Sequence, residues 1–307
     1  HCGSPCHVPS TPATGGAGEM MERRCARPSA GAPGIVATAA TRLRRAARTY
    51  EILVSASLRG KMQYRLDFLG STLIQTLMGA DNILFIGAVL WRFGPVMGWS
   101  IFDIAMLYAV SRMGNGVYML FCNELDRFEL YMVNGDFDTL LIRPWPTLFT
   151  LLARGVGIDR LAFLAQGIAA AALAAPRLVS TGVIGGWDAL WLLASVAWSA
   201  LLYFAVGLAT AAAGFWIVRI EELQVFTMNA PSTATAYPLD VYPSWLKWVF
   251  VTLLPLGLGC YVPLRFILDK GGTALNLLWP ALASPVAVWA ALKLWKTGEA
   301  HYTSTGT

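Results

Sequence analysis

Long uncharged stretches divide this chain into segments of membrane-spanning length. Residues 189–218 and 271–292 contain no charged side chain, and about 20 mostly apolar residues are enough for a helix to cross the hydrocarbon core of a bilayer. Two more runs, 66–91 and 101–122, each contain only two charged residues, and 147–175 becomes apolar after a charged start. The pattern predicts an all-α integral membrane protein.

Three apolar runs remain in the C-terminal part of the chain, 223–239, 242–268 and 273–295. The positive-inside rule tests how many of them cross. With the N-terminus inside, the inner flanks hold the N-terminal basic cluster, Arg127, Arg143, Arg154, Arg219, Lys293 and Lys296, whereas the outer flanks hold Arg92, Arg177, Lys247, Arg265 and Lys270. This balance places both termini in the cytoplasm, which requires an even number of crossings.

One of the three runs must therefore fail to cross. The run 242–268 is interrupted by Pro243, Pro255 and Pro263. Proline removes a backbone donor, and irregular backbone is tolerated in a membrane only where protein or water covers it. We expect 242–268 to form a re-entrant pair of short helices from the outer face, within a fold of six transmembrane helices. On this pattern alone the alternative, in which 223–241 does not cross, stays open.

The N-terminal part of the chain differs from the rest in composition. Its first 41 residues are rich in Pro, Gly, Ser and Thr and predict a disordered tail. Because the chain begins at His1 rather than Met, we expect part of the tail before Met20 to precede the natural start. The predicted organisation is a tail (1–41), an amphipathic interfacial helix (42–64), a six-span domain (65–297) and a cytoplasmic C-terminal tail (298–307).

Composition supports a membrane protein and argues against nucleic-acid binding. The chain is 56% hydrophobic and 13% charged, whereas soluble domains carry about 25% charged residues. Its net charge of +5 comes mostly from arginines and a lysine between residues 42 and 65. In a membrane protein such a cluster is typical of a cytoplasmic flank attracted to anionic lipids. Lipids, and not nucleic acid, are therefore the expected contacts.

The sequence holds no recognisable catalytic or nucleotide-binding motif. The phosphate-binding pattern G-x-x-x-x-G-K-[ST] does not occur, and histidines occur only at His1, His7 and His301. A zinc site or a Ser–His pair within the membrane is therefore not expected. We expect a chain that is not itself an enzyme and carries no cofactor or metal.

Polar and aromatic residues in the first two predicted spans are candidates for a substrate path. Arg112 lies near the middle of the second span, and ionisable residues at that depth are costly and by default functional. It either lines a cavity, touching substrate or pairing with Asp81, or forms a buried ion pair that fixes two helices. Both interpretations stay open. The candidate set is Asp81, Phe85, Tyr108, Arg112, Asn115 and Tyr118.

The segment Asn134–Pro146, NGDFDTLLIRPWP, follows the second span on the predicted cytoplasmic side. A glycine, two acids, an apolar Leu-Leu-Ile run and an Arg-Pro stop predict a short amphipathic helix with a defined end. The segment is either an ordinary loop or, because its leucines face the cytoplasm, an element that docks into a partner's groove.

Three stretches resemble one transporter family. The pattern G-x-x-D-x-L-L-x-R-P at Gly135–Pro144 is similar to that of type-2 permease subunits of ATP-binding-cassette exporters, more narrowly of antibiotic or multidrug export components. The proline-rich Tyr237–Pro263 and the ending W-x-x-G-x-x-x-Y-x-S-x-G at Trp295–Gly306 resemble the same family. The resemblance covers residues 42–307 and leaves the tail without a counterpart.

This resemblance implies a permease of six spans with re-entrant helices before the last span, which agrees with the re-entrant interpretation of 242–268. Such permeases sit in the cell membrane as homo- or heterodimers, export drugs, antibiotics or lipids, and dock on a separate subunit that binds ATP and Mg²⁺. Gly135–Pro144 would be the first coupling helix. The implied coupling residues are Gly135, Asp136, Asp138, Leu141, Arg143, Pro144, Arg219, Glu221 and Glu222.

Two other classes are weighed against this one. An ion-coupled secondary transporter often carries internal repeats and acids at the membrane midplane, but the halves of this chain show no convincing repeat. A membrane-embedded enzyme would need a catalytic cluster, which the scattered acids do not provide.

Overall fold

The computed structural model describes residues 97–303 except 158, 159 and 218, together with isolated positions between 44 and 95. The predicted tail, the interfacial helix and the first span therefore lie outside the described residues, apart from those positions. Every regular element in the described ranges is a helix. This confirms the predicted all-α class.

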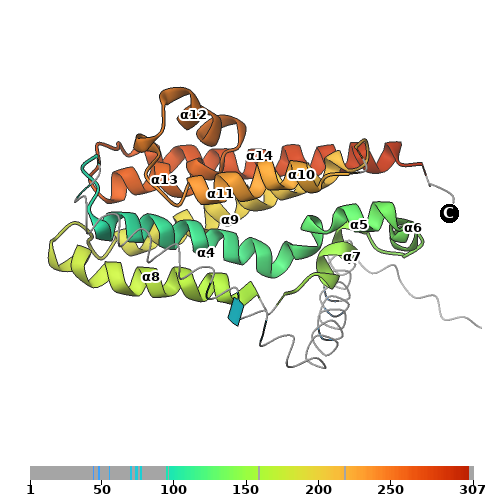
Figure 1. Ribbon diagram of the computed structural model, residues 1–307, viewed down its shortest axis with the longest axis horizontal. Coiled ribbons are helices and arrows are strands. Elements are labelled where there is room, and N and C mark those ends of the chain that lie inside the picture. The colour runs from blue at the N-terminus through green and yellow to red at the C-terminus, as the bar shows by residue number, and fades with distance from the viewer. Residues whose placement is uncertain are drawn as a thin grey trace, which may run out of the picture. The chain divides into compact units, whose positions relative to one another are not determined.

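Four long helices form the body of residues 97–303 (Figure 1): α4 (Ile101–Asp126), α8 (Leu161–Ser180), α9 (Asp188–Ala213) and α14 (Leu275–His301). By length and composition, α8, α9 and α14 are suited to cross a membrane. At about 1.5 Å per residue, each of them reaches about 30 Å or more, which is the thickness of the hydrocarbon core. Helix α4 is as long as α9 but less apolar, because it carries Asp103, Arg112 and Glu124.

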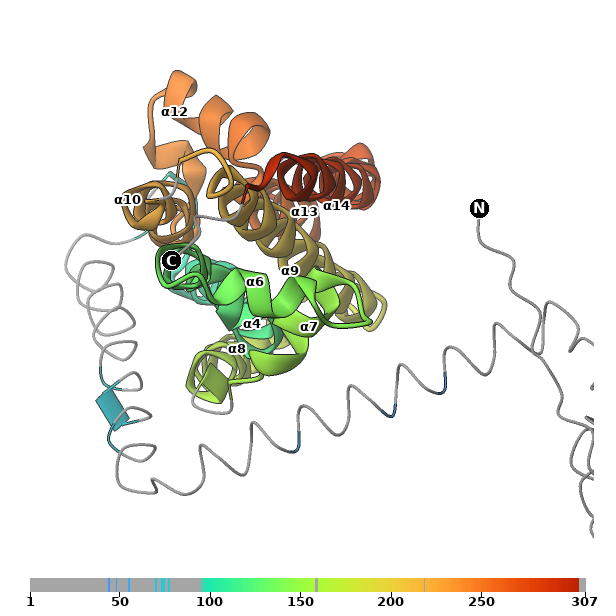
Figure 2. The same ribbon diagram turned by 90° about the vertical axis from the view of Figure 1, so that its right-hand side faces the viewer.

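Small residues bring these helices close together. Helices α4 and α8 run side by side (Figures 1 and 2), and a Cβ added to Gly116 of α4 would lie 2.9 Å from the backbone nitrogen of Leu164. A Cβ on Gly114 would collide with the side chain of Ser199 on α9. Helices that associate inside a bilayer depend on such close backbone packing. The alanine-rich α9 thus packs within the chain, against α4, α13 and α14.

Helix α4 defines two ends of the bundle, which we call the Trp99 end and the α6 end. At the Trp99 end, where α4 begins, the indole of Trp99 donates to Asp240 over 3.1 Å. At the α6 end, beyond Asp126, a carboxylate oxygen of Glu129 accepts hydrogen bonds from the backbone of Ile220 and Glu221. The segment from Glu221 to Asp240 therefore runs the whole length of α4.

The helical part of this segment is shorter than the run 223–239 suggested. It consists of α10 (Glu221–Gln224), the π-helix η2 (Val225–Asn229) and α11 (Ala230–Ala234), followed by the 3₁₀ turn η3 (Leu239–Val241). These helical turns fall short of the roughly 20 residues that a straight crossing needs. Extended and turn backbone completes the distance to the Trp99 end.

The run 242–268 forms two helices with a sharp bend between them. Helix α12 (Ser244–Trp248) continues as η4 (Val249–Leu253), and α13 (Leu256–Ile267) follows at an angle of 109°. The bend falls at Pro255, whose ring disfavours helical geometry in the residue before it. After α13, Lys270 forms an ion pair with Asp103 (2.7 Å) near the start of α4. The helix pair α12–α13 therefore begins and ends at the Trp99 end of the bundle.

Three helix boundaries differ from the sequence pattern. The run 147–175 is broken into α7 (Thr147–Arg154) and α8, because Gly157 turns back and donates its N–H to the carbonyl of Leu120. Helix α8 continues through Pro176, beyond the end of the apolar run 147–175, since neighbouring helices let spans tolerate proline. Helix α14 continues to His301, into the predicted C-terminal tail.

Candidate functional site

The predicted amphipathic segment folds as a short helix at the α6 end. Helix α5 (Phe128–Val133) is followed by Gly135 in the left-handed conformation (φ 72°), which only glycine adopts without strain. Helix α6 (Asp136–Leu141) then begins with Asp136 and Asp138 in its first turn, where negative charge is favourable. The helix is thus shorter than the predicted Gly135–Pro144.

An aromatic cluster holds the inner face of α6. The cluster comprises Phe128, Phe137, Phe215, Trp295 and Tyr302. The ring of Phe137 lies 4.9 Å from that of Tyr302 and 5.3 Å from that of Phe215, between centroids. Trp295 lies 5.0 Å from Phe128 and 5.1 Å from Phe215. Such aromatic contacts add about 0.5–1.5 kcal/mol per pair beyond burial. The cluster therefore connects α6 with α5, with the C-terminal end of α9 and with the C-terminal end of α14.

Two of the family-like motifs meet in this cluster. The hydroxyl of Tyr302 donates to Asp138 over 3.0 Å, and burial, followed by the neighbouring Asp138, raises the pKa of Tyr302. Trp295, Gly298 and Tyr302 of the C-terminal motif share one side of the chain end, and Gly298 lies directly against Phe215. Asp138, assigned to ATPase coupling by resemblance, therefore also faces the interior.

Apart from Gly135, the remaining coupling candidates of α6 and of the turn after it face outward. Asp136, Leu141, Arg143 and Pro144 are exposed, and the side chain of Ile142 is 82% exposed. Figure 2, which looks along the bundle from the α6 end, shows α6 and α7 in front of α4 and α9. These exposed residues therefore lie on the outer side of α6 and of the turn after it, whereas the other side of the helix is packed against the bundle.

The second predicted coupling segment lies beside α5. Arg219, Glu221 and Glu222 are exposed at the start of α10. The Glu129 carboxylate of α5 accepts from the backbone N–H groups of Ile220 and Glu221, each over 2.7 Å. These groups are unpaired donors at a helix start, so the carboxylate acts as an N-terminal cap supplied by another helix.

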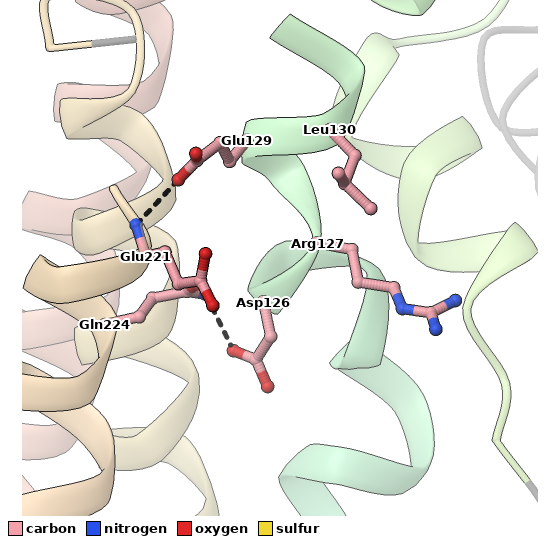
Figure 3. Close-up of a pocket in the computed structure, with 6 residues that line it drawn as sticks. All are labelled: Asp126, Arg127, Glu129, Leu130, Glu221 and Gln224. Atoms are coloured by element: carbon pink, nitrogen blue, oxygen red, sulfur yellow. Dashed lines mark hydrogen bonds between the residues drawn. The ribbon is translucent and has the colours of Figure 1, made fainter. Parts of the chain in front are cut away.

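A further hydrogen bond joins α10 to the last residue of α4. The amide of Gln224 donates to Asp126 over 3.2 Å (Figure 3). Between these contacts lies a pocket of about 240 Å³, lined by Asp126, Arg127, Glu129, Leu130, Glu221 and Gln224. In Figure 3 the guanidinium of Arg127 points away from the carboxylates. The structure thus connects the second predicted coupling segment to the end of α4 and to α5, the helices that lead into α6.

The substrate-path candidates differ from one another in burial, and two of them are not described. Tyr108, Asn115 and Tyr118 are buried inside the bundle, and Arg112 is partly exposed. Tyr118 donates to Asp126 over 2.6 Å and therefore belongs to the α6 end. Asp81 and Phe85 lie outside the described residues. The pairing of Arg112 with Asp81 therefore remains a prediction.

Sequence reasoning missed Glu129, Phe215 and Gln224, which connect the segments. The sequence pattern assigned no role to Glu129. Its partner is backbone 91 residues away, and backbone donors leave no trace in side-chain patterns. Among the described residues, no group of three His, Cys, Asp or Glu side chains is placed to hold a metal.

A family match spans all the elements of this site. The family described as ABC-2 family transporter protein matches residues 76–306, which is more than two thirds of the chain. No curated protein and no solved structure matches it. The matched range includes α6, α10 and the C-terminal motif that packs on them. This chain therefore belongs to the ABC-2 transporter family and is a multi-pass membrane permease of an ABC transporter.

Proposed function

We propose that this chain is the permease subunit of an ATP-driven exporter, and that α6 docks on a separate ATPase subunit. The observation that carries the proposal is the way in which α6 is packed, with one side buried and the other exposed. Its inner side chains, Phe137 and Leu140, are fully buried, while Leu141 and Ile142 are exposed. A helix so anchored passes a displacement imposed on its outer face to α9 and α14 through the aromatic cluster, because packed cores deform little.

Charge and contacts support a second docking point. Arg219, Glu221 and Glu222 lie at the start of α10, which Glu129 connects to α5. A movement of α5 and α6 would therefore also reach α10. We assign the second cytoplasmic contact with the ATPase to this group, as the family resemblance implies.

We infer six crossings, with both termini cytoplasmic. They are residues 66–91, α4, α8, α9, the segment Glu221–Asp240 and α14. The bent pair α12–α13 is then re-entrant, since it begins and ends at the Trp99 end. Arg143, Arg219 and Lys296 lie toward the α6 end, which agrees with a cytoplasmic α6 end.

The remaining partners follow from this assignment. ATP and Mg²⁺ bind to the partner ATPase, and a second permease subunit, identical or related, completes the path across the cell membrane. The substrate is hydrophobic or amphipathic, in the range of drugs, antibiotics and lipids. No contact in the described residues favours ion-coupled secondary transport.

The test is vanadate-sensitive ATP hydrolysis by the permease reconstituted with the ATPase that co-purifies with it. Ile142→Asp and Arg143→Ala should each lower permease-dependent hydrolysis about tenfold, because a docking anchor is worth about 1–2 kcal/mol or more. Asp138→Ala should lower it as well, by releasing Tyr302.

Val241 supplies the matched control. It is an exposed aliphatic residue at the Trp99 end, so Val241→Asp should leave assembly and hydrolysis at the wild-type level. If Ile142→Asp and Arg143→Ala both left complex assembly and hydrolysis unchanged, α6 would not be the docking helix.

A further inference from the structure

Arg112 occupies an unusual position for a charged side chain. It lies eleven residues into α4 (Ile101–Asp126), about 17 Å from the start of the helix at 1.5 Å per residue. Under the proposed topology this is close to the bilayer midplane. An ionisable side chain at that depth is costly and normally faces a substrate path or an oppositely charged partner.

The surroundings of Arg112 are aromatic. Its guanidinium carbon lies 5.2 Å from the ring centroid of Tyr108, one turn earlier on α4, and 6.0 Å from that of Phe163 on α8. Within the described ranges of the chain, no carboxylate lies within salt-bridge distance of it; the ion pairs there are Lys247–Asp240 and Lys270–Asp103. Rings attract a cation but do not accept its N–H groups as a carboxylate does.

Two polar atoms at this place lack partners among the described residues. The Nε of Arg112 is shielded from solvent without an acceptor, and the Oδ1 of Asn115 is shielded without a donor. Asn115 is only 6% exposed, and residues three apart share one side of a helix. Buried polar atoms are nearly always hydrogen-bonded. A donor and an acceptor left open three residues apart on α4 therefore indicate a missing partner.

We propose that Arg112 and Asn115 bind the head of an anionic amphiphile during export. The carboxylate, sulfate or phosphate of that molecule pairs with the guanidinium, since the fork of N–H groups on Arg matches such oxyanions. A hydroxyl or amide of the head donates to Asn115. Tyr108 and Phe163 contact the adjoining apolar part. Arg112 and Phe163 are both partly exposed, so the site is reachable from the helix surface.

This inference rests on the proposed function for its biological meaning and narrows its substrate class from amphipathic to anionic. The test needs no ATPase, so it fails or succeeds independently of the docking assignment. The probe is a diazirine-bearing dodecyl phosphate, compared with its neutral dimethyl ester. The full chain is placed in nanodiscs of zwitterionic lipid, irradiated, and the labelled peptides are located by mass spectrometry.

The wild-type chain should be labelled on α4 and α8 about tenfold more by the phosphate than by the ester, the effect of one charge-assisted contact. Unlabelled dodecyl phosphate should compete. Arg112→Gln should abolish the preference, and Arg112→Lys should keep part of it because the charge remains. Arg177→Gln, which changes an exposed arginine of α8, should label like the wild type.

Equal labelling of the wild-type chain by phosphate and ester would overturn the proposal, and this comparison does not depend on any variant folding. Wild-type labelling of a folded Arg112→Gln protein would overturn it as well. The first of these results has one specific form, in which the wild-type chain shows no preference while Asp81→Asn does. Arg112 would then be paired with Asp81 of its own chain.

Discussion

Replacing Glu129 with Ala removes the carboxylate that caps the start of α10 from α5. The two hydrogen bonds that it accepts, from the N–H groups of Ile220 and Glu221, are both 2.7 Å long. Hydrogen bonds to charged groups contribute about 1.5–3 kcal/mol each when shielded, but Glu129 and Glu221 are partly open to water, which would replace one of them. Loss of a helix cap costs about 0.5–2 kcal/mol.

The expected cost is therefore about 1–2 kcal/mol of local stability, mainly from the N–H of the buried Ile220. Amide hydrogen exchange measures this directly, because a segment that opens more easily exchanges faster in proportion. In Glu129→Ala, the amides of residues 220–224 should exchange about 5–30-fold faster. Glu129→Gln keeps a carbonyl acceptor and should change exchange by no more than about threefold.

Amides in the middle of α9, such as that of Leu202, serve as the internal reference and should not change. Unaltered exchange at Ile220 and Glu221 in Glu129→Ala would refute the capping role. So would equal acceleration by Ala and Gln, because the effect would then not depend on a hydrogen-bond acceptor.

Two further predictions concern packing within the bundle. Tyr302→Phe and Asp138→Asn should each lower stability by about 0.5–1.5 kcal/mol, and thermal unfolding of the double variant should show a loss smaller than the sum, since both changes remove one contact; additive losses would contradict that contact. Gly116→Ala should cost about 1–3 kcal/mol, because the new Cβ would meet the backbone of Leu164 at 2.9 Å. Gly186→Ala, where a Cβ meets nothing within 4 Å, should change the melting temperature little, and equal shifts in the two glycine variants would show that α4 and α8 do not pack this closely.

The long helices were the part of the fold that the sequence predicted best. Uncharged residues 189–218 became α9 (Asp188–Ala213), because an apolar run of that length has no stable place except a helix in lipid. The bend at Pro255 was also predictable, since the conformational effect of proline is local. Pro176 shows the limit of this reasoning. This proline has the same local effect on the backbone as Pro255, but packing of α8 against α4 keeps the helix intact.

The candidate site was predicted as two separate segments and not as one connected unit. Gly135 and the acids after it indicated α6 because turn and helix-start chemistry is local. The contacts that join the segments span 91 residues at Glu129 and 164 at Asp138. Such contacts depend on how long helices pack, and a single sequence carries no record of that.

The bond between Tyr302 and Asp138 has a consequence for engineering chimaeras. A coupling segment moved alone from this permease into a relative would leave Phe137 and Asp138 facing a foreign chain end. The transplant should therefore include residues 295–302 with residues 128–144, as one exchangeable cassette. If α6 docks on the ATPase as proposed, a permease rebuilt in that way would keep the ATPase specificity of this chain, whereas a graft of the loop alone would change the docking surface and weaken the packing that supports it.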